Sequence, residues 1–171
     1  MSASFDLDEV DGFVCAAIGQ PGERVFYIQA TSGSIAISLK LEKLQVGLLA
    51  DYLERLIETQ ALPEGPPAID TGLVQPVIPE WVVGSMMVAI NEASGRVIVI
   101  AQELTEDEND EDDDDDFIED PDVGQLRVAL SRNQVVQFIA RARDLIAGGR
   151  ETCRLCGRPM DTEGHACPRW N

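Results

Sequence analysis

Residues 35–59 read IAISLKLEKLQVGLLADYLERLIET, and within this segment one apolar period replaces another. From Ile35 to Leu41, apolar residues alternate with small or polar ones, which is the period of a half-buried strand. From Glu42 to about Thr59, apolar residues recur every three or four positions, which predicts an amphipathic helix. The residues expected on its buried face are Leu44, Leu48, Leu49, Tyr52, Leu53, Leu56 and Ile57.

Two more strands are expected upstream of this segment. Phe13–Ile18 is apolar, and Arg24–Thr31 is rich in β-branched and aromatic residues. The turn signal Gln20-Pro21-Gly22 separates these two segments, and Ser32-Gly33 precedes the next strand. The first part of the chain therefore predicts the order β-β-β-α.

The same order is expected again after residue 80. The strands expected there are Met86–Ile90, Arg96–Gln102 and Leu126–Leu130. Ser131 is placed to cap a helix, with Gln134 as its capping-box partner, and Gly148-Gly149 is placed to end it. The residues expected on its apolar face are Val135, Phe138, Ile139, Ala142, Leu145 and Ile146.

The two halves can be laid over one another. Gly22–Val25 then falls on Ser94–Val97, and Gln45-Val46 falls on Gln134-Val135. Two interpretations of this similarity remain open, a true duplication or the general likeness of any two β-β-β-α units.

With either interpretation, six strands and two amphipathic helices predict an α+β fold, in which a mainly antiparallel sheet carries helices on a face.

The domain organisation follows from these elements. We expect one α+β domain over residues 1–149, with halves at 10–60 and 81–149, and a separate tail at 150–171. Residues 61–80 carry five prolines, which resist regular structure and favour an extended connector on the surface. A binding loop is the alternative interpretation of this connector.

The segment 103–122 is an acidic insert in the second half. It holds 14 acidic residues and no basic one, so it accounts for most of the net charge of −18. Such a segment buries little apolar area and is expected to be disordered. It lacks the glycine that an EF-hand loop needs at its sixth position, although weak cation binding or docking to a basic partner remain alternatives.

The chain gives no sign of membrane insertion or secretion. Its longest apolar runs, such as Val97–Ala101, are far shorter than the about 20 residues that cross a bilayer. The first residues contain neither a basic nor an apolar signal region. We therefore expect a cytoplasmic protein.

The tail carries the clearest chemical signal in the sequence. Cys153 and Cys156 are followed by Gly157, the pattern of a zinc knuckle whose turn needs a positive φ. His165 and Cys167 are two residues apart, so in an extended segment both can reach one ion. These four residues predict a tetrahedral Cys₃His site holding one zinc ion per chain.

We expect this zinc to be structural. Four protein ligands leave no open position, whereas catalytic zinc usually keeps one for water. His165 is also the only histidine, so no second one can serve as a general base. If the spacing of His165 and Cys167 does not allow both to bind, Asp161 or a water could be the fourth ligand.

Cys15 and a group of basic residues in the tail are further candidates for chemistry. Cys15 lies in a predicted strand between apolar neighbours and is expected to be a small buried hydrophobic residue. Basic residues near an aromatic side chain can bind single-stranded nucleic acid, but the acidic insert would repel phosphates, so we do not expect nucleic-acid binding. The residues concerned are Arg150, Arg154, Arg158, Arg169 and Trp170.

The order of these features resembles an uncharacterised bacterial family that is classified as a domain of unknown function. The resemblance rests on a β-rich body, an acid-rich insert and a tail reading Cys-x-x-Cys-Gly-x-Pro-Met-Asp, then Gly-His-x-Cys-Pro-Arg. It covers essentially the whole chain and is most specific over Cys153–Arg169. It implies no particular activity.

Three hypotheses about function follow. The first is a non-enzymatic protein that binds a protein partner, and an apolar patch near the tail would favour this hypothesis. The second is an enzyme with a carboxylate site, which would need a cleft with buried carboxylates. The third is a nucleic-acid-binding module, which would need a continuous positive face around the tail arginines.

Overall fold

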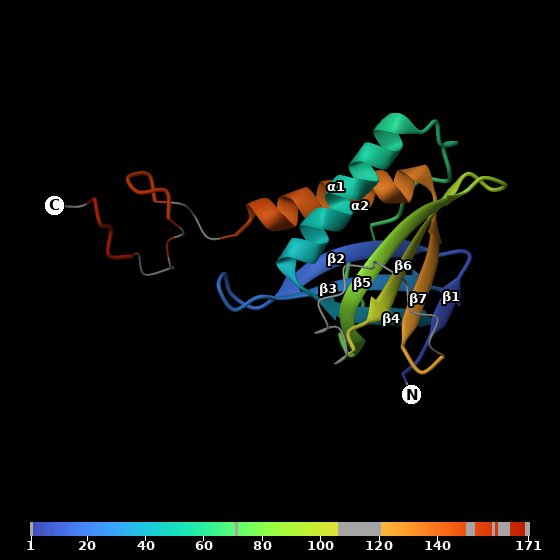
Figure 1. Cartoon of the computed structure of the whole chain (residues 1–171), viewed down its shortest axis with the longest axis horizontal. Coiled ribbons are helices and arrows are strands. Elements are labelled where there is room, and N and C mark those ends of the chain that lie inside the picture. Colours follow the sequence, from blue (N-terminus) through green and yellow to red (C-terminus); the bar gives the residue numbers. More distant parts are fainter. Residues whose placement is uncertain are drawn as a thin grey trace, which may run out of the picture.

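The computed structural model describes residues 2–70, 72–105, 121–149, 153–158, 160 and 165–169. These residues form an α+β fold with a mainly antiparallel seven-stranded sheet and two helices, as the sequence predicts (Figure 1). The elements are β1 Phe5–Leu7, β2 Gly12–Ile18, β3 Val25–Ser32, β4 Ile35–Leu41, α1 Lys43–Thr59, β5 Pro79–Asn91, β6 Arg96–Glu103, β7 Gln125–Leu130 and α2 Arg132–Ala147.

The sheet has the strand order β1-β7-β6-β5-β4-β3-β2. Strands pair antiparallel within each half, and the parallel pairs β4–β5 and β1–β7 involve both halves. The edge strands β1 and β2 are separated by residues 8–11, which span at most about 18 Å. Because the edges of a flat seven-stranded sheet lie about 29 Å apart, this sheet must curl.

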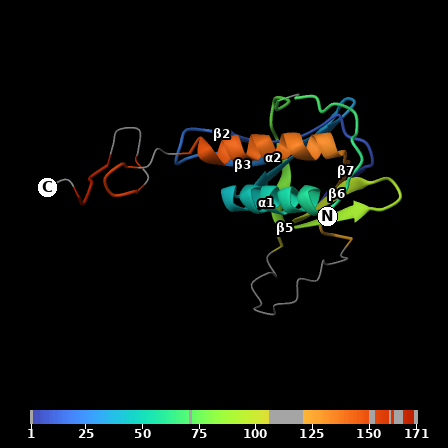
Figure 2. The same ribbon diagram turned by 90° about the horizontal axis from the view of Figure 1, so that it is seen from above.

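The two helices lie side by side, run in opposite directions and cover one face of the curled sheet (Figures 1 and 2). Arg143 of α2 joins them, since its guanidinium forms ion pairs with Asp51, at 2.7 Å, and with Glu54 of α1. Among the described residues, neither helix is long and apolar enough to cross a membrane.

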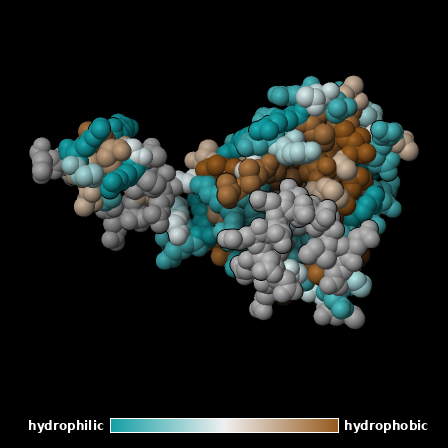
Figure 3. All heavy atoms as spheres, in the orientation of Figure 1, coloured by the Kyte–Doolittle hydropathy of each residue, from teal (hydrophilic) through white to brown (hydrophobic). Residues whose placement is uncertain are grey.

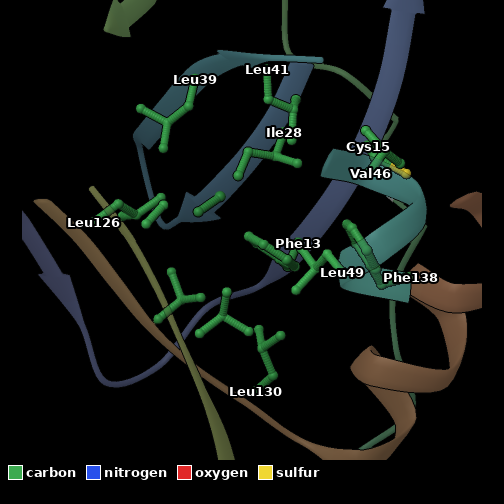
Figure 4. Close-up of a cluster of buried hydrophobic side chains, with 14 of the residues drawn as sticks. Phe13, Cys15, Ile28, Leu39, Leu41, Val46, Leu49, Leu126, Leu130 and Phe138 are labelled. Carbon is green, nitrogen blue, oxygen red and sulfur yellow. The ribbon is translucent and has the colours of Figure 1, made fainter. Parts of the chain in front are cut away.

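The core is mainly aliphatic, with Phe13, Phe26, Trp81 and Phe138 as its buried aromatic residues, and it lies between the helices and the inside of the sheet (Figure 4). Side chains of both halves meet there, and the buried residues of α2 match the predicted face. The labelled residues in Figure 4 are Phe13, Cys15, Ile28, Leu39, Leu41, Val46, Leu49, Leu126, Leu130 and Phe138.

A glutamine near the start of each helix connects the two halves. In α2, the predicted capping box is confirmed, since Gln134 accepts a hydrogen bond from the backbone N–H of Ser131 at 2.9 Å. The amide of Gln134 also donates to the carbonyl of Val10, just before β2. Gln45 of α1 repeats this arrangement and donates to the carbonyls of Val83 and Gly84 in β5.

The structure corrects the predicted number and length of the strands. The sequence predicted six strands, but β1 is a seventh, and β5 begins at Pro79 instead of at residue 86. Residues 79–80, which we expected in the connector, therefore belong to a strand. Both missed segments form parallel pairs with strands distant in sequence, β1 with β7 and the start of β5 with β4. Local apolar periodicity does not reveal such pairs.

The pairing registers also correct the sequence overlay. Leu41 and Leu130 each stand directly before a helix cap, and they pair with Phe26 and Val97. Val97 is therefore equivalent to Phe26, and the predicted match with Val25 was wrong by one residue. The start of β5 pairs with β4 in the same register in which β1 pairs with β7. The rest of β5 pairs with β6 in the same register in which β2 pairs with β3. The start of β5 is therefore comparable to β1, and its remainder is comparable to β2. The halves are thus alike in contacts as well as in element order.

The connector runs without helix or strand over its described residues before β5. Side chains of the body hold it in place. The amide of buried Gln29 both donates to and accepts from the backbone of Val74, and Asn133 donates to the carbonyls of Gly65 and Pro66. These contacts fit a connector fixed to the surface.

The predicted acidic insert begins inside β6, whose last residue is Glu103. Leu104 continues beside β5, where its N–H donates to the carbonyl of Val82 at 2.8 Å. Residues 106–120, for which we predicted disorder, lie outside the described residues.

The bridging role of Gln134 gives a stability prediction. The Gln134→Ala variant should lower the free energy of unfolding by about 2 kcal/mol, because it removes the helix cap and leaves the Val10 carbonyl without its partner. Urea unfolding measures this loss. The control variant Gln137→Ala changes a half-buried glutamine on the same helix and should cost less than about 0.5 kcal/mol. Equal losses in the two variants would contradict the bridging role.

Candidate metal centre

The structure brings the four residues predicted as metal ligands together. The ligand atoms of Cys153, Cys156, His165 and Cys167 all lie within 4.8 Å of one another. Cys153 is buried, and the other three side chains are partly buried. This Cys₃His cluster could hold a metal ion.

The distances within the cluster fit a small tetrahedral ion. The sulfur atoms of Cys153 and Cys167 lie 3.8 Å apart, and two thiolates on one zinc ion are separated by about 3.8 Å. The Sγ atom of Cys156 and the Nε2 atom of His165 lie 3.2 Å apart. His165 and Cys167 thus both reach the same point, despite having a single residue between them.

The first cysteine pair sits on a tight turn. Gly157 has the positive φ that the sequence predicted, at 71°, and its N–H donates to the carbonyl of Cys153 at 2.8 Å. The N–H groups of Cys156 and Leu155 point at the Cys153 sulfur and lower the pKa of that thiol. A turn that directs N–H groups at a thiol stabilises the thiolate, which is the form that binds metal.

Comparison with known protein families places this arrangement in context. A family model described as "Protein of unknown function (DUF3090)" matches residues 5–167. The chain belongs to this family. The DUF3090 match begins at the first residue of β1 and ends at Cys167, so it includes all four residues of the cluster. No curated protein and no solved structure matches the chain.

The arginines of the DUF3090 tail do not all serve the same purpose. Arg154 and Arg158 are exposed. The guanidinium of Arg169 instead donates to the carbonyl of Leu155 at 3.1 Å, which ties the end of the tail to the knuckle turn. Arg150 and Trp170, which we considered for nucleic-acid binding, lie outside the described residues, as does the alternative ligand Asp161.

Cys15 is separate from the cluster and confirms its prediction as a buried residue. It is 0% exposed, and burial raises the pKa of its thiol from the usual 9.0 to about 11. The thiol is therefore neutral at physiological pH, and a neutral thiol is a poor nucleophile.

The buried polar side chains of the described residues are amides and hydroxyls. They are Gln29, Thr31, Ser38, Gln102, Ser131 and Gln134. A cleft with buried carboxylates, which would favour the enzyme hypothesis, is not found in this described part of the chain.

The apolar face predicted for α1 is only partly correct. The buried residues are Val46, Leu49, Ala50 and Leu53. Leu44, Leu48 and Tyr52 were expected in the core but are 72%, 57% and 52% exposed. These three residues are four apart and form a row beside the buried face. That spacing is the signal in the sequence that the helix has a second, exposed apolar row.

Proposed function

We propose that this protein is a non-enzymatic protein-interaction or accessory protein whose tail is held together by one structural zinc ion. The observation that carries the proposal is the closed donor set, in which four ligand atoms lie within 4.8 Å of one another. A metal with four protein ligands has no position for a substrate or a reactive water. Its remaining role is to hold the chain in one conformation.

The ligand types favour zinc over other metals. Three thiolates and one imidazole suit zinc, whereas magnesium and calcium prefer oxygen ligands. A tail this short cannot build a core of its own, so binding of the ion would supply the free energy that folds it. The three tail cysteines and Cys15 are free thiols, which fits a reducing compartment, and we propose the cytoplasm.

The knuckle carries an apolar residue that can contact a partner. Leu155 is 51% exposed, and it lies between the two cysteines of the turn. The tail extends beyond the C-terminal end of α2, away from the sheet (Figures 1 and 2). A rigid turn that presents an apolar side chain suits protein contact.

Affinity capture with the zinc-loaded full chain tests the role of the tail. We expect the wild type to recover a specific protein that the Leu155→Glu variant fails to recover, with the zinc content of the variant unchanged. The matched control is Ile69→Glu, which places the same charge on a 62% exposed aliphatic residue of the connector and should recover the protein. Equal recovery by Leu155→Glu and the wild type would contradict a contact through the knuckle.

Titration with single-stranded RNA and DNA at low salt tests the nucleic-acid alternative under the conditions where electrostatic binding is strongest. We expect no binding at micromolar concentrations. Micromolar affinity that disappears when Arg154 and Arg158 are changed to glutamate would overturn the proposed role in protein contact.

A further inference from the structure

An apolar groove lies between α1 and β5, away from the metal cluster. It encloses about 400 Å³, a volume in the range of ligand-binding pockets. Figure 3 shows hydrophobic side chains, in brown, gathered on this face of the molecule with hydrophilic side chains, in teal, beside them. The residues that line the groove are Gln45, Leu48, Leu49, Tyr52, Gly84, Met86, Met87 and Val88.

One wall of the groove is the edge of a strand. β5 pairs with β4 only through its first residues, up to Val82, while β6 pairs with it as far as Asn91. From Ser85 onward, no other strand of the described chain pairs with β5 on the side opposite β6. A strand edge of this kind presents unpaired backbone N–H and C=O groups.

The equivalent contact in the other half identifies the backbone groups that face the groove. The registers make Phe13 equivalent to Met86 and Cys15 equivalent to Val88. The carbonyl of Cys15 accepts a hydrogen bond from Arg141 of α2, so it points away from β3. Because backbone groups alternate along a strand, the N–H and C=O groups of Met86, Val88 and Ile90 point away from β6.

The equivalent site in the other half is filled by side chains of α2. Phe138 stacks on Phe13 with ring centroids 5.0 Å apart, and Arg141 donates to the edge of β2. Gln45 and Gln134 hold the same position in their helices, so Leu49 is equivalent to Phe138 and Tyr52 to Arg141. Leu49 is smaller than Phe138, and Tyr52 has no guanidinium like that of Arg141. These differences leave the groove open.

We propose that the groove binds an extended, apolar segment of a partner protein, which adds as a strand beside β5. Like the filled site at α2, the groove has an apolar wall and a strand edge whose backbone groups need hydrogen-bond partners. A peptide strand supplies both, since its backbone pairs with the edge and alternate side chains pack against the helix. This role rests on the proposed function in protein contact and gives the partner a second surface, separate from the tail.

Charge favours a segment flanked by lysine or arginine. The chain carries a net charge of −18, and Leu104, from which the acidic insert continues, is bonded to β5 at Val82. The negative electrostatic field of such a chain attracts basic partners and raises their rate of association. The same charge disfavours a second copy of this chain as the occupant, because two such copies repel each other.

Selection from a library of random peptides of about ten residues, the length of a long strand, tests the groove directly with the full chain as bait. We expect enriched peptides that alternate apolar and polar residues and carry basic flanks. Enrichment of apolar residues at helical spacing, enrichment of acidic peptides, or no enrichment would each overturn the proposal.

Two matched variants locate the site of a selected peptide. Leu48→Glu places a charge in the groove and should weaken binding at least about tenfold, whereas Leu44→Glu lies on the same helix but outside the lining and should retain affinity. Both side chains are mostly exposed, so both variants should melt like the wild type. Equal affinity for Leu48→Glu and the wild type would place the peptide elsewhere and overturn the proposal.

Backbone methylation of the same peptide distinguishes strand addition from other modes of binding. Methyl groups on every second amide should weaken binding at least about tenfold in one frame, because those amides pair with β5, and little in the other frame. Equal effects in both frames would contradict a strand. Failure of these tests would leave the Leu155 capture result intact, so the role of the groove and the role of the tail can fail separately.

Discussion

The Cys153→Ser variant is expected to purify with almost no zinc, whereas the wild type should contain about one ion per chain. Cys153 is the buried member of the cluster, and its thiol is the one that the turn favours as a thiolate. A hydroxyl at this position cannot replace the thiolate as a soft ligand. Elemental analysis of the dialysed protein measures the difference, and Cys167→Ser should behave in the same way.

The body should keep its cooperative unfolding in these variants, because the cluster lies outside the main core. The matched control is Cys15→Ala, which removes a cysteine from the core and should leave the zinc content unchanged. Full zinc retention in Cys167→Ser would refute the four-ligand assignment. Loss of zinc in Cys15→Ala would show that the metal depends on the body.

The second large effect is expected from Phe138→Ala in α2. Phe138 is fully buried and stacks on Phe13, so truncation removes apolar contacts and leaves a cavity between the helix and β2. Comparable truncations cost about 3–5 kcal/mol. In a chain of this size we expect the melting temperature to fall by about 10 °C.

Thermal and urea unfolding measure the loss in Phe138→Ala. Val136→Ala is the control on the same helix, since Val136 is 41% exposed and its truncation should cost less than about 1 kcal/mol. In a double-mutant cycle with Phe13→Ala, the two losses should not add, because the rings contact each other. Additive losses would indicate that the stacking contributes nothing beyond burial.

The sequence predicts the elements with strong local signals. The alternation over residues 35–41 defines β4 to the residue, and the Ser131–Gln134 capping box marks the start of α2. The Cys₃His cluster that could hold a metal ion was predictable for a similar reason. Cysteine spacing followed by glycine specifies a turn directly, and Gly157 has the expected φ.

Features that depend on distant contacts were not predictable. β1 has three residues, and its place in the sheet comes from pairing with β7, which is distant in the sequence. Leu48 and Tyr52 match the pattern of a buried helical face, and their exposure depends on how far α1 stands from β5. That the groove is the open counterpart of the filled site at α2 follows only from the exact pairing registers of both halves.

The paired glutamine contacts have a consequence for the symmetry of the fold. Gln45 reaches from the first half to β5, and Gln134 reaches from the second half to Val10, two residues before β2, so the same contact is made twice in opposite directions. Reciprocal contacts of this kind relate the subunits of a two-fold symmetric dimer. The two halves are nevertheless parts of one chain and differ in sequence, so the pseudo-symmetry is broken at the helices. One site is filled by Phe138 and Arg141 of α2, while its counterpart at α1 stays open, an asymmetry that two identical subunits in a symmetric dimer would not have.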